Sequence, residues 1–184
     1  MGLMVHSLGE LPAEAVRGYF VYLLDYGWSE PLGDALSSNF NRMAEQASRN
    51  NAVVIRGVVG EHFADEVLSW HHVNGKPAED ILPAILVTSR NPHDFRESVP
   101  SDNAVHPLLL IPLRAACNST SDVALLSERL FSDIRAGTEL SKFQIAEEQK
   151  RGKAGALTDA LILRPTVAGV GVDLKQIFSW LMGR

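Results

Sequence analysis

The chain has 184 residues, of which 46% are hydrophobic and 21% charged, with a formal net charge of −5 at pH 7. These values are ordinary for one globular domain and exclude a disordered chain. The acidic balance argues against nucleic acid as a partner, because an acidic surface repels the phosphate backbone.

Cysteine usage and apolar runs predict the compartment. A single cysteine, Cys117, cannot form an intrachain disulfide, so nothing indicates secretion. Residues 1–9 contain no basic start followed by an apolar stretch of signal-peptide length. The longest dense apolar run, 108–113, is too short to span a bilayer. We therefore expect a soluble, cytoplasmic protein that does not enter a membrane.

The first 50 residues are predicted to form a pair of helices packed on the rest of the domain. Residues 13–26 form the first predicted helix, since Pro12 suits a first helical turn and Gly27 suits a helix end. The second is predicted over 31–49. Its apolar residues recur every three or four positions and make one stripe: Leu32, Leu36, Phe40, Met43 and Ala47.

A βαβ unit is predicted next. Residues 52–59 are rich in β-branched side chains and read as a buried strand, 61–72 as a helix, and 82–89 as a second strand. Two strands joined through one helix should be parallel, with a right-handed crossover. Pro83, at the start of the second strand, invites comparison with thioredoxin-like folds. The chain has no Cys-x-x-Cys, so this comparison concerns topology only and is not a resemblance.

The remaining elements continue the alternation of helix and strand. A long loop over 90–106 precedes a third strand, whose two prolines weaken it or place it near a sheet edge. The later elements are predicted at these ranges: strand 107–113, helix 121–135, helix 138–151, strand 157–163 and helix 173–181. The chain is therefore predicted to be a single α/β domain over 1–184. A four-stranded, mostly parallel or mixed sheet is flanked by helices, with two extra N-terminal helices.

Arginines stand at the ends of all four predicted strands. They are Arg56, Arg90, Arg114 and Arg164. Ligands of open α/β sheets bind outside the carboxyl ends of the strands, and arginine is the preferred donor to carboxylate and phosphate. Neighbouring loops would add His62, His93 and Asn118. The alternative is that arginine is a common residue where a strand meets water. An antiparallel third strand would also divide the four between two edges.

Other chemical groups have simpler structural interpretations. His62 and Glu66 stand one helical turn apart, but no third metal ligand has a recognisable spacing, so no metal is predicted. His93 could act as acid or base, although its surroundings read as a plain turn. Cys117 precedes a helix and is more often a buried filler than a nucleophile. No motif predicts a cofactor.

Two functional hypotheses follow. The first is a non-catalytic recognition or assembly domain that self-associates or docks on a larger protein. Apolar residues such as Phe20 and Trp180, on predicted terminal helices, favour it. The second is a small enzyme or sensor that binds an anionic, nucleotide-like ligand at the carboxyl edge of the sheet. It depends on the arginines and on the loop over 90–106.

Overall fold

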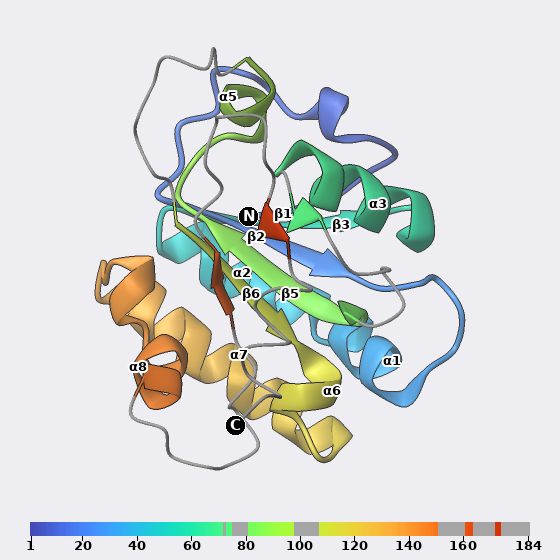
Figure 1. Ribbon diagram of the computed structural model, residues 1–184, viewed down its shortest axis with the longest axis vertical. Helices are drawn as coiled ribbons and strands as arrows, with labels where there is room; N and C mark the ends of the chain where they lie inside the picture. Colours follow the sequence, from blue (N-terminus) through green and yellow to red (C-terminus); the bar gives the residue numbers. More distant parts are fainter. Residues whose placement is uncertain (72, 75–80, 98–106, 151–160, 164–171, 174–184) are drawn as a thin grey trace.

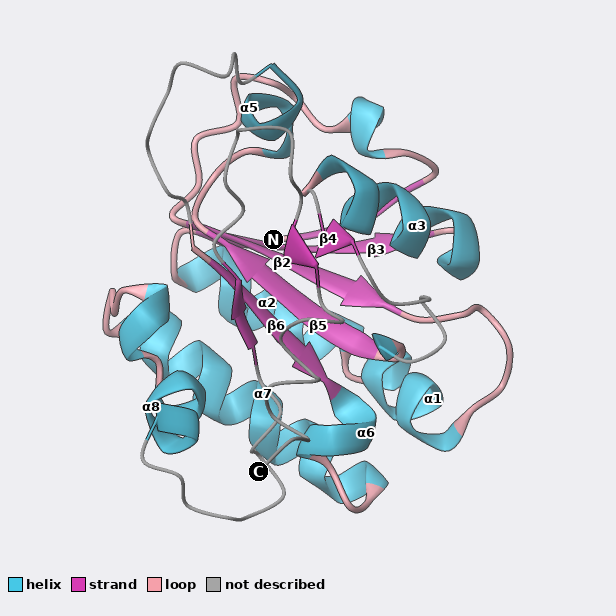
Figure 2. Cartoon of the chain, viewed as in Figure 1, coloured by secondary structure: helices cyan, strands magenta, loops and turns pink. Residues whose placement is uncertain are grey.

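A computed structural model describes residues 1–71, 73–74, 81–97, 107–150, 161–163 and 172–173 of the protein. Within these ranges a mixed β-sheet runs through the middle of the molecule, and helices cover both of its faces (Figure 1). The strands are the magenta arrows of Figure 2. The layered α/β architecture with a mixed sheet is therefore confirmed.

The described part of the main sheet has six strands in the order β1-β3-β2-β5-β6-β7. They are β1 Gly2–Val5, β2 Tyr19–Leu24, β3 Ala52–Gly57, β5 Ala84–Thr88, β6 Leu108–Pro112 and β7 Leu161–Leu163. β1, β3 and β2 run parallel to one another, whereas β5, β6 and β7 each run antiparallel to the strand before them in the sheet. The carboxyl ends of β2, β3 and β6 thus share one edge, which we call the carboxyl edge. The carboxyl end of β5 lies at the opposite edge, the amino edge.

Most of the helical residues cover one face of the sheet. The elements on this face are α1 Pro31–Ser38, α2 Phe40–Arg49, α6 Leu113–Ala116, α7 Thr120–Arg135, the 3₁₀ turn η2 Leu140–Lys142, and α8 Gln144–Lys150. α2 lies against β1 and β3, and α7 contacts α1, α2 and α8 (Figure 1).

The opposite face is covered by α3 Gly60–Trp70, which packs on β2 and β3. The 3₁₀ turn η1 Leu8–Glu10 and the short helix α5 Pro92–Glu97 lie beside α3. A separate two-stranded parallel sheet joins β4 Val73–Asn74 to β8 Val172–Asp173. No helix in the described ranges is long and apolar enough to cross a membrane.

Both faces of the central strands are buried. In β2, Phe20, Tyr22 and Leu24 point to the α3 side, and Val21 and Leu23 point to the side of α2 and α7. Successive side chains of a strand point to opposite faces, so a strand with helices on both sides carries apolar residues at every position. This burial explains why the strand sequences show no polar alternation.

The predicted N-terminal helical pair is wrong. Residues 13–26 do not form a helix: they contain an irregular segment and then β2, a run of aromatic and aliphatic residues that favours a strand. β1 precedes it, so residues 1–50 contribute two strands to the sheet. The second predicted helix exists but is divided at Asn39 into α1 and α2.

The predicted parallel pairing of the first two strands is also wrong. They correspond to β3 and β5, and β2 lies between them, parallel to β3 and antiparallel to β5. β2, which was not predicted as a strand, occupies the position next to β3 that the predicted βαβ unit gave to the strand over 82–89. The sheet consequently has six strands in the described ranges where four were predicted.

The later elements mostly lie where they were predicted. β6 and α7 match their ranges, and α7 is capped by Ser119 and Asp122 in a capping box. The helix over 138–151 is replaced by η2 and the shorter α8. β7 forms the end of the fourth predicted strand. Residues 157–160 and 174–181 lie outside the described residues, as does Trp180.

Candidate functional site

A buried aspartate faces an arginine at the carboxyl edge. Asp25 directly follows β2, and its carboxylate accepts hydrogen bonds from the backbone N–H of Gly27 at 2.9 Å and the hydroxyl of Ser37 at 3.3 Å. Arg56 is the penultimate residue of β3, and its Nε lies 4.0 Å from Asp25 Oδ2. That Nε is buried and makes no hydrogen bond within the described ranges. The two opposite charges offset one another where both strands leave the sheet.

An aromatic pair stands beside this ion pair. The rings of Tyr26 and Trp28 are stacked, with centroids 4.5 Å apart and planes inclined by 2°. Tyr26 is buried, whereas 59% of Trp28 is exposed. Both belong to the connection from β2 to α1, at the right of Figure 1. The stacking holds the exposed indole ring of Trp28 against the buried ring of Tyr26.

A second ion pair completes the group. Arg114 in α6 donates from Nε to Glu30 Oε1 at 3.2 Å. This hydrogen bond raises the pKa of Arg114, and the nearby Tyr26 raises it further. We call these residues the carboxyl-edge cluster: Asp25, Tyr26, Trp28, Glu30, Arg56 and Arg114. They come from the connections after β2 and β6 and from the last residues of β3, and the carboxyl ends of strands are the usual place for function in an α/β sheet.

The four strand-end arginines do not converge at one edge. Arg56 and Arg114 share the carboxyl edge, but Arg90 follows β5 and lies at the amino edge, because β5 runs antiparallel to β2. Its Nε lies 3.5 Å from Asp94 Oδ2, and its guanidinium lies 5.7 Å from the centroid of Phe95. Arg164 lies outside the described residues. Each described arginine of the set has a carboxylate of its own protein beside it.

The other predicted site residues are also divided between the two edges. His62 is exposed near the start of α3, at the carboxyl edge. Asn118 is exposed between α6 and α7, and its backbone N–H donates to Asp122. His93 lies in α5 at the amino edge, where its Nε2 donates to the carbonyl oxygen of Leu11 at 2.7 Å. The strand directions therefore place His62 and Asn118 at the same edge as Arg56, and His93 at the opposite edge.

Two further candidates serve the fold. Glu66, one turn beyond His62, accepts hydrogen bonds from the Ser7 hydroxyl and the Leu8 N–H at 2.7 and 2.8 Å, and so holds η1. Cys117 is buried, and burial together with the charge of Asp122 raises the pKa of its thiol to about 11. A neutral, buried thiol is a poor nucleophile, so the helix that follows does not activate it.

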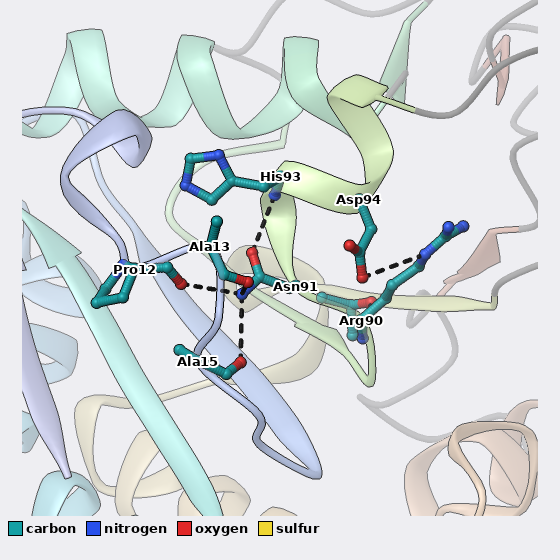
Figure 3. A network of polar contacts seen from close by, with 8 residues as sticks. Pro12, Ala13, Ala15, Arg90, Asn91, His93 and Asp94 are labelled. Carbon is teal, nitrogen blue, oxygen red and sulfur yellow. Dashed lines mark hydrogen bonds and ion pairs between the residues drawn. The ribbon is translucent and has the colours of Figure 1, made fainter.

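The amino edge holds a polar network that sequence reasoning missed. The amide nitrogen of Asn91 lies 3.1 to 3.2 Å from the carbonyl oxygens of Pro12, Ala13 and Ala15 (Figure 3). Asn91 Oδ1 accepts from the His93 N–H at 3.0 Å. The turn residues Asn91 and Pro92 were visible in the sequence, but the loop that they hold lies about eighty residues earlier, and local pattern cannot indicate such a contact.

The carboxyl-edge cluster was only partly predicted. Arg56 and Arg114 were identified as strand-end residues, but Asp25 and Tyr26 were assigned to the end of the predicted helix over 13–26, and Trp28 was assigned to no element. The run of aromatic and aliphatic residues over 19–24 was the signal that could have found them, because it favours a strand that ends just before Asp25. Comparisons with known families, curated proteins and solved structures give no significant match.

Proposed function

We propose that this chain is a non-catalytic recognition and assembly domain, which self-associates or docks on a larger protein through the surface around Trp28. The observation that carries the proposal is the exposed Trp28 stacked on the buried Tyr26. Tryptophan is enriched among the few residues that dominate binding energy at protein interfaces. A ring already held by stacking loses little conformational freedom when a partner covers it.

The engagement of the chemically reactive side chains also supports a non-catalytic role. Glu66 holds η1, His93 holds the segment before β2, and the Cys117 thiol is buried and neutral. The topology is also compatible with the comparison to thioredoxin-like folds, because three parallel strands are followed by antiparallel strands and Pro83 precedes β5. Dithiol chemistry needs paired cysteines, and this chain has one.

We propose a cytoplasmic location, since one cysteine cannot form an intrachain disulfide.

Sedimentation velocity over a wide concentration range tests self-association. The chain should form a reversible oligomer, and Trp28→Ala should weaken it. Removing a central aromatic anchor typically costs about 2 kcal/mol or more of binding free energy. Leu125→Ala is the matched control, because Leu125 is also exposed, at 54%, but lies on α7. A chain that stays monomeric throughout, or two variants that behave alike, would contradict assembly through the Trp28 surface.

A second candidate function is favoured by the position of Arg56. Its buried Nε has no hydrogen-bond partner among the described residues, and Arg114 shares the same edge. We propose as the alternative that a small enzyme or sensor site binds an anionic, nucleotide-like ligand here, between Arg56, Arg114, His62 and Asn118. The anion would have to displace Asp25 and Glu30 from their present pairing, which lowers the affinity.

Calorimetric titration with inorganic phosphate and with a nucleoside monophosphate tests this alternative. Arg56→Ala and Arg114→Ala should each weaken binding, because a charge-assisted hydrogen bond contributes roughly 1.5–3 kcal/mol when it is shielded from water. Arg90→Ala is the matched control, since it removes an arginine from the opposite edge. Equal effects of all three changes, or no binding by the native chain, would exclude an anion site at the carboxyl edge.

A further inference from the structure

A pocket of about 290 Å³ opens at the amino edge, on the side of the sheet that α3 covers. Its inner wall is formed by the sheet, with Leu3 of β1, Phe20 of β2 and Val53 of β3. Its outer wall is the irregular segment over 11–17, including Leu11 and Ala15. The volume is about twice that of a cavity of ~150 Å³, which holds one benzene ring. The pocket therefore accommodates a branched aliphatic or aromatic side chain.

The outer wall is held at a fixed distance from the sheet by buried polar groups. Asn91 is 7% exposed, and its two amide hydrogens are shared among the carbonyl oxygens of Pro12, Ala13 and Ala15 (Figure 3). His93 Nε2 holds the carbonyl of Leu11. An apolar gap beside a free loop would close, because collapse buries more apolar surface. The Asn91 bonds oppose that collapse, so the pocket is formed before any ligand arrives.

Two opposite charges stand at the mouth of the pocket. Glu14 and Arg17 both line it, and both are exposed. Neither makes a side-chain hydrogen bond or an ion pair within the described ranges. All the other lining side chains are apolar, and the ammonium group of Met1, which also lines the pocket, donates to the carbonyl oxygens of Ala44 and Ala52. The pocket thus pairs an apolar interior with the side-chain charges of Arg17 and Glu14 at its rim.

We propose that this pocket binds a hydrophobic α-amino acid, free or as a zwitterionic analogue. The apolar side chain enters between Phe20 and Ala15, the carboxylate faces the guanidinium of Arg17, and the ammonium group faces the carboxylate of Glu14. Only a molecule that carries both charges next to an apolar group satisfies the interior and both rim residues together. The site lies at the edge opposite Trp28 and Arg56, so it does not depend on the function proposed above.

A titration followed by ¹H–¹⁵N correlation spectra tests the proposal, with L-phenylalanine as the probe. Saturable shifts should occur at the amides of Leu3, Ala15, Phe20 and Val53. Two analogues separate the charges: 3-phenylpropionate lacks the ammonium group and phenethylamine lacks the carboxylate. Both should bind about two- to fivefold more weakly than phenylalanine, as expected for one solvent-exposed ion pair.

Substitutions distinguish a specific site from general adhesion. Arg17→Ala should weaken the binding of phenylalanine and 3-phenylpropionate by about two- to fivefold and leave the binding of phenethylamine unchanged. Glu14→Gln should weaken the binding of phenylalanine and phenethylamine by the same factor and leave the binding of 3-phenylpropionate unchanged. Ala15→Phe should abolish binding by filling the pocket. Arg49→Ala and Glu45→Gln are the matched controls, because they remove exposed charges of the same kinds on α2 and should change nothing.

Four results would overturn the proposal. They are the absence of saturable shifts, equal affinity for all three compounds, binding that persists in Ala15→Phe, and control substitutions that act like those at the rim. Near-ultraviolet circular dichroism checks that Ala15→Phe keeps its tertiary structure. If Ala15→Phe distorts the segment over 11–17, the substitutions Arg17→Ala and Glu14→Gln still test the site, because both residues are exposed.

Discussion

The amide nitrogen of Asn91 lies 3.1 Å from the carbonyl oxygen of Ala13, which precedes it by 78 residues in the chain. Together with the bonds to Pro12 and Ala15, this contact ties the turn after β5 to the segment before β2 (Figure 3). One side chain thereby satisfies three carbonyl groups of a segment that has no regular secondary structure of its own.

Replacing Asn91 by alanine should destabilise the protein more than replacing an asparagine that holds one carbonyl. We expect a loss of roughly 2–3 kcal/mol for Asn91→Ala, since each hydrogen bond contributes about 1 kcal/mol. Asn50→Ala is the comparison, because among the described residues Asn50 Nδ2 donates to the Gln46 carbonyl alone, and it should cost about 1 kcal/mol. Urea unfolding measures both. Equal losses would show that the three bonds of Asn91 add little.

Gly57 should not accept a side chain. A Cβ atom at this position would lie 2.2 Å from Cβ of Phe63, closer than two non-bonded carbon atoms can approach. β3 and α3 would have to separate, so Gly57→Ala should cost about 2–3 kcal/mol of unfolding free energy. Gly9→Ala provides the control, because its added Cβ would find only the Ser7 hydroxyl at 3.5 Å. If thermal unfolding shows both variants to be equally stable, the close packing of α3 on β3 is not as described.

Two tyrosines of β2 should respond oppositely to loss of the hydroxyl group. Tyr22 is fully buried, and its hydroxyl has no hydrogen-bond partner within the described ranges. Tyr22→Phe should therefore be neutral or should stabilise the protein by up to about 1 kcal/mol. The Tyr19 hydroxyl donates to the Thr138 carbonyl at 2.6 Å, so Tyr19→Phe should destabilise by about 1 kcal/mol. Chemical denaturation of the two variants checks this, and a marked loss in Tyr22→Phe would contradict it.

The Cys117 thiol should be unreactive in the folded protein. Burial raises its pKa to about 11, so very little thiolate is present at pH 8. Reaction with a disulfide reagent such as dithionitrobenzoate should be slow in buffer and fast in urea. Rapid labelling of the folded chain at pH 8 would show that the thiol is accessible and ionised.

Stability should also depend on this thiol at alkaline pH. The folded pKa lies above the unfolded value of about 8.5, so the folded state retains the proton more strongly. The resulting stabilisation is fully present below pH ~8.5 and is lost as the pH rises towards 11. Cys117→Ala should lessen the fall in unfolding free energy over this interval. The raised pKa of Tyr22 causes a similar fall at higher pH, so the difference between native and variant chains is the quantity to compare.

Several elements could be predicted from local sequence because their patterns are unambiguous. The strands over 52–57 and 108–112 are short apolar runs, and α7 carries an apolar stripe. β2 could not be separated from a helix in this way. It is buried on both faces, so its apolar residues do not alternate, and Pro12 and Gly27 flank it as they would flank a helix.

Only those residues of the candidate site that stand at the end of a predicted strand could be predicted. Arg56 and Arg114 were found because each follows an apolar run, and both reached the same edge. Arg90 was identified by the same rule but lies at the other edge. The direction of β5 decides at which edge Arg90 lies, and the local sequence around Arg90 does not indicate that direction.

By itself the sequence determined that the chain forms a layered α/β structure with buried strands and amphipathic helices, because composition and periodicity act within each segment. Only the tertiary structure decided the order β1-β3-β2-β5-β6-β7, the edge at which each arginine lies, and the contact of Asn91 with residues 12–15. Strand order and direction depend on hydrogen bonds and apolar contacts between segments far apart in the chain. Such contacts depend on the packing of the whole domain, so a local pattern does not carry them.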